Sequence, residues 1–174
     1  MVLGIKGTGK SSLIIQYIQN HFIDDPNVLE ELTDDDYCKA VSVDNESCRV
    51  YTTDFPDKGP NELPPLTHSH GYMIIYSITS RPSFEAATEY REAILKQKEY
   101  QDVVMVLCAT KCDLSGYREV SKEEGELLAM QWGCPFVETS AYSRMNVDEA
   151  FHEVVREARR KLLKHKKGGG CLIL

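Results

Sequence analysis

A segment near the N-terminus has the residue types and the spacing of a phosphate-binding loop. It fits the pattern G-x-x-x-x-G-K-[ST], in which backbone N–H groups surround the phosphates of a nucleoside di- or triphosphate. Lys10 is expected to reach the outer phosphates, and the hydroxyl of Ser11 is expected to hold a Mg²⁺ ion. The loop consists of Gly4, Ile5, Lys6, Gly7, Thr8, Gly9, Lys10 and Ser11.

The sequence on either side of this loop predicts the elements that hold it in place. The apolar residues 1–3 precede it and favour a short strand. After it, apolar residues recur at helical spacing, which predicts a helix from residue 10 to about residue 22. A helix that begins at this point directs its N-terminus, and the partial positive charge there, at the phosphates.

A second segment, T-K-C-D at residues 110–113, follows an apolar run typical of a strand buried on both faces. Ligands bind at the C-terminal ends of such strands in open α/β sheets. The carboxylate of Asp113 can accept hydrogen bonds from N1–H and N2–H₂ of guanine, a donor pair that adenine lacks, and the stem of Lys111 can lie along the base. After the next strand, Ser140 and Ala141 can offer backbone N–H groups to the guanine O6.

The rest of the chain alternates between strand and helix patterns. Periodicity and turn signals predict further strands at residues 37–43, 47–54, 72–76, 103–109 and 135–137. They predict helices at residues 81–98, 121–133 and from 147 onward, with Ser80 and Ser121 at the start of the first two. We therefore expect an α/β fold of three layers, with a mostly parallel sheet and one antiparallel edge.

The composition is that of a soluble globular protein of one domain. The chain has 174 residues and a net charge of −7, with no run of about 18 apolar residues that could span a membrane. Its six cysteines lack metal-site spacing, and without a secretory signal we expect reduced, cytosolic thiols. Residues 24–57 contain eleven acidic and two basic residues, which argues against nucleic acid as the main partner.

The C-terminus carries two features typical of a membrane anchor. Residues 171–174, C-L-I-L, fit the prenylation pattern C-a-a-X, in which Cys171 takes the lipid and a final leucine favours geranylgeranyl. One lipid holds a protein only marginally, but residues 156–167 contain seven basic side chains and one acidic side chain, a second signal for an anionic surface. We expect a nucleotide-binding domain at residues 1–164, a basic, glycine-rich tail at 165–174, and attachment to the cytoplasmic face of the plasma membrane.

From Gly4 to Leu174 the chain resembles the Ras-type small GTPases. The matching motifs are G-I-K-G-T-G-K-S, T-K-C-D and E-T-S-A, in the order and close to the spacing of that family. The resemblance implies a Ras-like P-loop NTPase fold, GTP and GDP as ligands with Mg²⁺, and GTP hydrolysis in signal transduction. It also implies that Phe22 packs edge-on against the guanine, that Ser12 supports the phosphates, and that a monomer meets effector, exchange and activating proteins.

The sequence departs from the family in its two switch regions. Where the family has D-T-A-G-Q, residues 54–58 are D-F-P-D-K, so Asp54 can still hold a Mg²⁺-bound water. Asp57 replaces the glycine that touches the γ-phosphate, and Lys58 replaces the glutamine that orients the attacking water. The first switch loop is about three residues longer, and Thr33 is the only threonine there that could bind Mg²⁺.

Three further departures concern the phosphate loop, the base segment and the first strand. Lys6 stands where the family usually has glycine, and it would obstruct an inserted arginine finger, which contributes about 10³–10⁵ in rate. Thr110 stands where Ras itself has asparagine, as in some Rho-type relatives. The first strand begins several residues later than in the family. Lys10 and Lys58 are the candidate catalytic residues.

Three functions remain open from the sequence. The favoured one is a membrane-anchored small GTPase that hydrolyses GTP slowly. The second is a GTP-binding scaffold that no longer switches, which the residues Asp57 and Lys58 suggest. The third is a kinase of nucleosides or small molecules that uses the same phosphate loop, although the T-K-C-D segment and the Cys171 box argue against it.

Overall fold

The computed structural model describes residues 1–23, 36–54, 59–66, 69–99 and 103–168. Within these residues a central sheet contains parallel strands in the order β1-β4-β5-β6. Their bounds are Val2–Leu3 for β1, Tyr72–Ser77 for β4, Met105–Thr110 for β5 and Phe136–Glu138 for β6. An antiparallel hairpin is formed by β2 (Asp36–Val43) and β3 (Glu46–Thr53). The predicted α/β fold, with a mostly parallel sheet and an antiparallel edge, is confirmed.

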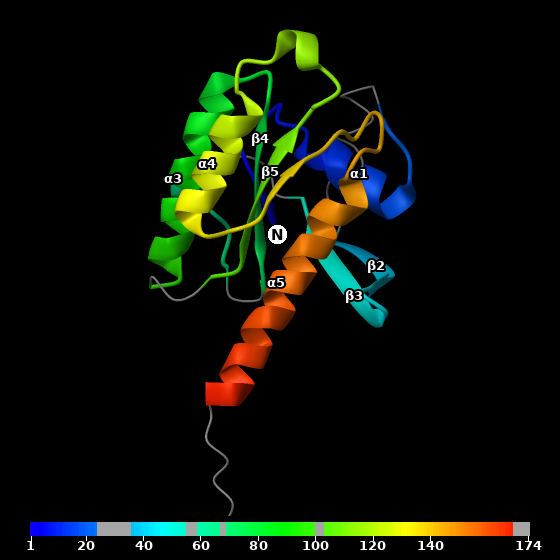
Figure 1. The fold of residues 1–174 in the computed structure, drawn as a ribbon, viewed down its shortest axis with the longest axis vertical. Coiled ribbons are helices and arrows are strands. Elements are labelled where there is room, and N and C mark those ends of the chain that lie inside the picture. The colour runs from blue at the N-terminus through cyan, green and yellow to red at the C-terminus, as the bar shows by residue number, and fades with distance from the viewer. Residues whose placement is uncertain (24–35, 55–58, 67–68, 100–102, 169–174) are drawn as a thin grey trace, which may run out of the picture.

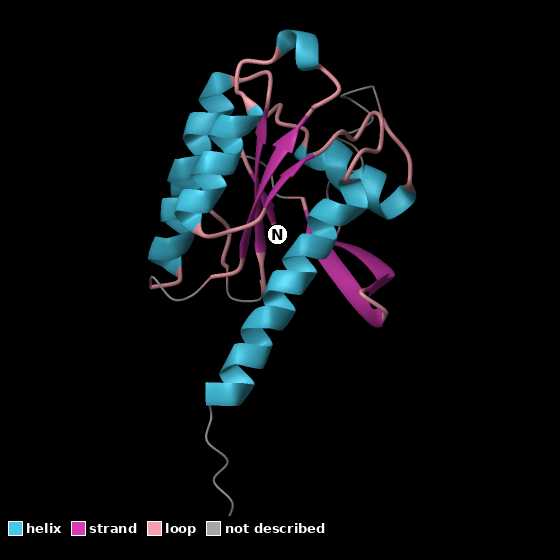
Figure 2. Cartoon of the chain, in the orientation of Figure 1, coloured by secondary structure: helices cyan, strands magenta, loops and turns pink. Residues whose placement is uncertain are grey.

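Helices cover both faces of the central sheet and give the molecule three layers (Figures 1 and 2). One layer contains α3 and α4, and the other contains α1 and α5, the helix that runs to the end of the described chain (Figure 1). The helices are α1 (Lys10–Gln19), α3 (Arg81–Gln97), α4 (Lys122–Trp132) and α5 (Val147–Gly168). Short 3₁₀ turns lie at Pro60–Glu62 and Ser115–Tyr117.

The central strands are buried on both faces because apolar side chains alternate between the two helical layers. On β4, Ile74 and Tyr76 join the core under α3 and α4, whereas Met73 and Ile75 join the core under α1 and α5. All six residues of β4 and all six of β5 are buried. This is the continuous apolar pattern that the sequence shows for strands of a parallel sheet.

The helix ends follow local signals in the sequence. Ser121 and Glu124 form a complete capping box at the start of α4, and the hydroxyl of Ser80 caps α3. Helix α1 ends at Gln19, earlier than the predicted residue 22, because Asn20 takes the left-handed conformation with φ of 56°. Asparagine tolerates this conformation and commonly ends a helix in this way.

In the part of the chain that the structure describes, the residue after the β2–β3 hairpin, Asp54, pairs with Val2 of the central sheet at one isolated bridge. A groove of about 650 Å³ separates β3 from the start of β4 and from α5. Thr52 lines this groove, and its hydroxyl is buried and has no hydrogen-bond partner among the described residues. The hairpin is tied to α5 by Arg156, which pairs with Asp44 at 3.0 Å.

Helix α5 continues to Gly168, beyond the predicted domain boundary at residue 164. The Cys171 box lies outside the described residues. In the part of the chain that the structure describes, no helix is both long enough and apolar enough to cross a bilayer.

Candidate nucleotide-binding site

The phosphate loop connects β1 to α1 and has a backbone shape that needs glycine. Gly7 and Gly9 have φ of 85° and 89°, a region that other residues rarely adopt. A Cβ atom at Gly4 would lie 2.4 Å from the carbonyl oxygen of Ile75, so this glycine permits close packing against β4. The loop can therefore wrap around a ligand with its backbone, as the motif predicts.

Lys10 is buried at the first turn of α1, with its ammonium group inside the loop. Its Nζ donates hydrogen bonds to the carbonyl oxygens of Gly4, at 2.7 Å, and Ile5, at 3.2 Å. The hydroxyl of Thr8 also donates to the carbonyl oxygen of Ile5, at 2.8 Å. These contacts fix a positive charge where the motif predicts the outer phosphates.

Two of the three predicted magnesium ligands lie together. The carboxyl group of Asp54 follows β3, is buried, and is hydrogen-bonded to the hydroxyl of Ser11. Burial raises the pKa of Asp54, while the Ser11 hydrogen bond and the nearby Lys10 charge act in the opposite direction. A hydroxyl and a carboxylate are oxygen ligands of the kind that Mg²⁺ prefers, so this donor pair fits the expected ion.

The T-K-C-D segment is joined directly to the phosphate loop. The Oγ1 of Thr110 is buried, 2.5 Å from the carbonyl oxygen of Thr8 and 2.9 Å from that of Tyr76. The Nζ of Lys111 donates to the carbonyl oxygen of Gly7 at 2.6 Å, and Lys111 itself has a φ of 60°. Two side chains of one segment thus hold the carbonyl groups of the other, and the two halves of the site are fixed relative to each other.

A cavity of about 300 Å³ lies between these two segments at the C-terminal end of β5. Seven of its lining residues are predicted site residues, although they come from separate parts of the sequence. The full lining is Gly9, Ser12, Leu13, Phe22, Thr110, Lys111, Asp113, Leu114, Ala141 and Tyr142. This size and this mixture of apolar walls and a few polar groups are typical of a small-molecule site.

The loop after β6 forms the far side of the cavity and is held from two directions. Ser140 is fully buried, and its backbone N–H donates to the carbonyl oxygen of Met145 at 3.0 Å. The side-chain amide of Gln16 donates to the carbonyl oxygen of Ala141 at 2.7 Å, which joins this loop to α1. The backbone N–H of Cys112 donates to the carbonyl oxygen of Thr139, which joins it to the T-K-C-D segment.

Comparison with known proteins agrees with this geometry. The profile of the Ras family matches residues 1–160. The chain belongs to the Ras family. It is 40% identical over 195 aligned positions to Ras-like protein rasB of Dictyostelium discoideum, covering all of this chain and 95% of that protein. It is 41% identical over 167 positions to a Ras-like protein of Laccaria bicolor, covering 92% of this chain and 77% of that protein.

Membership of the Ras family identifies the protein as a GTPase of the class that acts in signal transduction. Ras-like GTPases bind GTP and GDP, and they interact with regulators and effectors. The kinase alternative is therefore removed. The roles of the individual site residues remain predictions, and seven of those residues line one cavity. The predicted role of Ser140 is an exception, because its backbone N–H already donates to the carbonyl oxygen of Met145 and does not point to a guanine O6.

Tyr142 is a lining residue that the sequence analysis did not select. Its ring meets that of Phe22 edge-to-face, with centroids 5.5 Å apart and an interplanar angle of 88°. The two aromatic residues are 120 positions apart in the sequence, so no spacing signal links them. The adjacent E-T-S-A motif, which ends at Ala141, was the available clue to Tyr142.

Three predicted functional residues lie outside the described residues: Thr33, Lys58 and Cys171. Lys6 is described, and it is exposed on the phosphate loop. The thiols of the two cysteines close to the site stay protonated and unreactive, because burial raises the pKa of Cys108 to about 12 and that of Cys112 to about 11. Protonated thiols of this kind are poor nucleophiles and poor metal ligands.

Proposed function

We propose that this Ras-family protein binds guanine nucleotide and Mg²⁺ tightly but hydrolyses GTP slowly. The observation that carries the binding proposal is the cavity that joins Gly9 and Ser12 of the phosphate loop to Phe22, Lys111 and Asp113. In it Asp113 would accept hydrogen bonds from the guanine edge, and Phe22 would contact the face of the base. Ser11 and Asp54 would hold the Mg²⁺ ion, with Thr33 as the third candidate ligand.

The proposal of slow hydrolysis rests on the residues that replace the family's catalytic ones. A glutamine side chain can both donate and accept a hydrogen bond, so it can orient an attacking water, whereas the ammonium of Lys58 can only donate. Asp57 places a carboxylate where the family has the glycine that touches the γ-phosphate, and like charges repel. The exposed Lys6 adds bulk to the loop where an arginine finger would enter.

Single-turnover hydrolysis tests this proposal. Purified protein loaded with GTP and Mg²⁺ should release phosphate slowly, and a Ras-type activating protein should give far less than the usual acceleration of about 10³–10⁵. The double variant Asp57→Gly/Lys58→Gln should hydrolyse GTP faster than the natural chain. Lys58→Arg is the matched control, since it keeps the charge and should leave the rate low. Full acceleration of the natural chain by the activating protein would overturn the proposal.

The same experiment separates a second candidate, a GTP-binding scaffold without switching, which the presence of Asp57 favours. Such a scaffold would bind GTP and GDP with equal affinity and would release no phosphate. The slow GTPase would release phosphate and would bind effectors differently in its two nucleotide states.

We further propose that Cys171 is prenylated and that the protein is held, as a monomer, at the inner leaflet of the plasma membrane. The C-a-a-X box supplies one signal and the basic residues before it supply the second. Chain expressed in a eukaryotic cell should partition with membranes and should gain the mass of a geranylgeranyl group. Cys171→Ser should be cytosolic and unmodified, and membrane association of this variant would contradict the anchor.

A further inference from the structure

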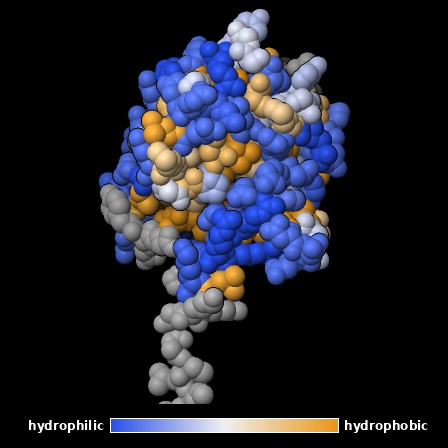
Figure 3. All heavy atoms as spheres, in the orientation of Figure 1, coloured by the Kyte–Doolittle hydropathy of each residue, from blue (hydrophilic) through white to orange (hydrophobic). Residues whose placement is uncertain are grey.

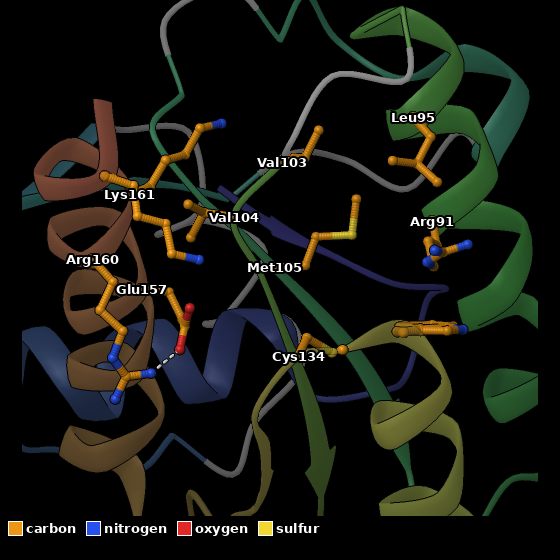
Figure 4. Close-up of a pocket in the computed structure, with 12 residues that line it drawn as sticks. Arg91, Leu95, Val103, Val104, Met105, Cys134, Glu157, Arg160 and Lys161 are labelled. Atoms are coloured by element: carbon orange, nitrogen blue, oxygen red, sulfur yellow. Dashed lines mark hydrogen bonds and ion pairs between the residues drawn. The ribbon is translucent and has the colours of Figure 1, made fainter. Parts of the chain in front are cut away.

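A second cavity, of about 280 Å³, lies at the N-terminal end of β5, opposite the nucleotide site. Its walls come from α3, from the start of β5, from the turn between α4 and β6, and from the last turns of α5 (Figure 4). Four basic side chains and one acidic side chain line it. The whole chain has a net charge of −7, so this concentration of positive charge is a local exception.

The positive charge lines this cavity because basic residues of α5 lie on the same face of the helix. Glu157, Arg160, Lys161 and Lys164 recur at spacings of three and four residues, which places them on one stripe of the helix. Arg159 lies on another face, where it donates to the carbonyl oxygen of Val43 and is committed to the hairpin. Figure 3 shows hydrophilic residues along the lower half of this face, together with a small apolar patch close to the end of α5.

The four cations differ in the contacts they already make. Arg160 is paired with Glu157, and Arg91 pairs with Glu92 at 2.8 Å. Neither Lys161 nor Lys164 has an ion pair or a hydrogen bond with any residue that the structure describes. In Figure 4, Arg160 and Lys161 extend from α5 on one side of the cavity, and Arg91 extends from α3 on the other.

We propose that this basic pocket binds a small anion that carries several phosphate groups. Lys161 and Lys164 would contact phosphate oxygens from the α5 side, and Arg91 would contact a second phosphate from the α3 side. The cavity is larger than one phosphate needs, and its cations stand on opposite walls, which favours a multiply phosphorylated ligand over a single ion. An inositol phosphate in solution and the headgroup of a phosphoinositide lipid share this chemistry. The proposal does not depend on prenylation or on GTP hydrolysis.

The chain contains a built-in reporter for this pocket. Trp132 is its single tryptophan and lines the cavity, with the guanidinium of Arg91 5.4 Å from the centre of its ring. A ligand that binds Arg91 places negative charge close to this ring and should change its fluorescence. Tryptophan fluorescence therefore reports on this site and not on the nucleotide cavity, whose lining contains no tryptophan.

The test uses the full, unlipidated chain saturated with GDP and Mg²⁺, so that the nucleotide site is blocked. Inositol trisphosphate should change the fluorescence of Trp132 in a saturable way. Lys161→Ala/Lys164→Ala should weaken this binding by about tenfold or more, because two charged contacts to phosphate are lost. Lys96→Ala/Lys122→Ala is the matched control, since it removes the same charge outside the pocket, and it should retain the affinity within about twofold.

A second arm distinguishes the two sources of the ligand. Phosphatidylcholine vesicles with and without phosphatidylinositol bisphosphate are mixed with the same three proteins: the natural chain and the two double variants. Binding to both the soluble trisphosphate and the phosphoinositide vesicles supports the pocket as a headgroup site, and binding to the trisphosphate alone supports it as a site for a soluble ligand. Absence of saturable binding in both arms, or equal loss in the two double variants, would overturn the proposal.

Discussion

The two ends of β5 offer anions two different kinds of surface. At the C-terminal end, Thr110 and Lys111 fix the phosphate loop through its backbone carbonyl groups, and glycines supply its shape. At the N-terminal end, Lys161 and Lys164 extend from α5 without partners among the described residues. A strand of six residues spans about 20 Å, so the two surfaces are well separated.

This difference bears on selectivity. Backbone groups and locked side chains lose little freedom when a ligand binds, so the nucleotide end can discriminate by shape and by hydrogen-bond pattern. A free lysine is a strongly hydrated point charge on a flexible stem, and ordering it costs up to about 2 kcal/mol. The basic end should therefore select charge more than shape.

The largest expected effect comes from a substitution that weakens the nucleotide site and leaves the basic pocket intact. Lys10→Ala deletes the charge inside the phosphate loop, and charge-assisted hydrogen bonds contribute about 1.5–3 kcal/mol each, so the affinity for GTP should fall by about a hundredfold or more. Isothermal titration with GTP and with inositol trisphosphate measures both sites. An equal loss of trisphosphate binding would show that the two ends are not independent.

The next effect tests whether the nucleotide end is fixed in advance. Thr110→Val keeps the shape of the side chain but removes the hydroxyl shared with the carbonyl oxygens of Thr8 and Tyr76. Leaving buried carbonyl groups without a donor costs about 1–3 kcal/mol, so the affinity for GDP should fall by about tenfold. Thr110→Ser, which keeps the hydroxyl, is the control and should stay close to the natural chain.

Salt should affect the two ends unequally. Between about 0.1 M and about 1 M salt the Debye length falls from about 10 Å to about 3 Å, which screens exposed charges far more than buried ones. The affinity for inositol trisphosphate should decrease several-fold, while the affinity for GDP changes much less. Titrations of both ligands across this range, with Mg²⁺ held constant, provide the measurement. Equal losses of affinity for GDP and for inositol trisphosphate would contradict the proposed difference between the two sites.

The smallest effect concerns α4, which ends at Trp132 in the basic pocket. Ser121→Ala removes the N-cap and should lower stability by about 1 kcal/mol, or the Tm by about 2–4 °C, without changing either binding site. A hydrogen bond from Arg81 lowers the pKa of Glu124, its capping partner, from 4.5 to about 2. This stabilisation is complete above pH 4.5 and is lost as the pH falls toward 2, but Arg81 and the backbone N–H of residue 121 supply it in both proteins. Thermal unfolding at pH 7 and pH 3 should therefore show a lower Tm for both at pH 3, with the difference between them nearly unchanged.

The segments of the nucleotide end could be located from the sequence because their signals are local. A glycine at positive φ, a lysine next to a hydroxyl residue and an aspartate after a buried strand each leave a short-range signal, and so does the capping box at Ser121. Helix α1 ended earlier than predicted because the left-handed Asn20 outweighed the apolar residues that follow it. The contact between Phe22 and Tyr142 depends on distant segments and had no such signal.

The basic end could not be predicted from the sequence, although its lysines were noticed. From the sequence, the whole run of basic residues indicates contact with an anionic membrane surface. In the structure the run is divided by helical phase: Arg156 and Arg159 hold the hairpin, whereas Lys161 and Lys164 line a cavity. The opposite wall, with Arg91 and Trp132, comes from helices whose positions only the tertiary structure defines.

Among the described residues, the hairpin is joined to the central sheet by the one bridge between Val2 and Asp54, which bears on how the structure opens locally. The hairpin's internal ladder runs from Asp36 opposite Thr53 to Val43 opposite Glu46, so it can separate from the central sheet while keeping its own hydrogen bonds. A groove lies beside β3, and the turn of the hairpin is held to α5 by Arg156 and Arg159, through contacts near the surface that are weaker than a buried strand ladder. The hairpin should thus behave as a separate cooperative unit, or foldon, whose amide protons exchange with solvent through a lower-energy opening than those of β4 and β5. Because Asp54 forms the bridge to Val2, Mg²⁺ bound to Asp54 would stabilise the closed state of the hairpin and slow that exchange.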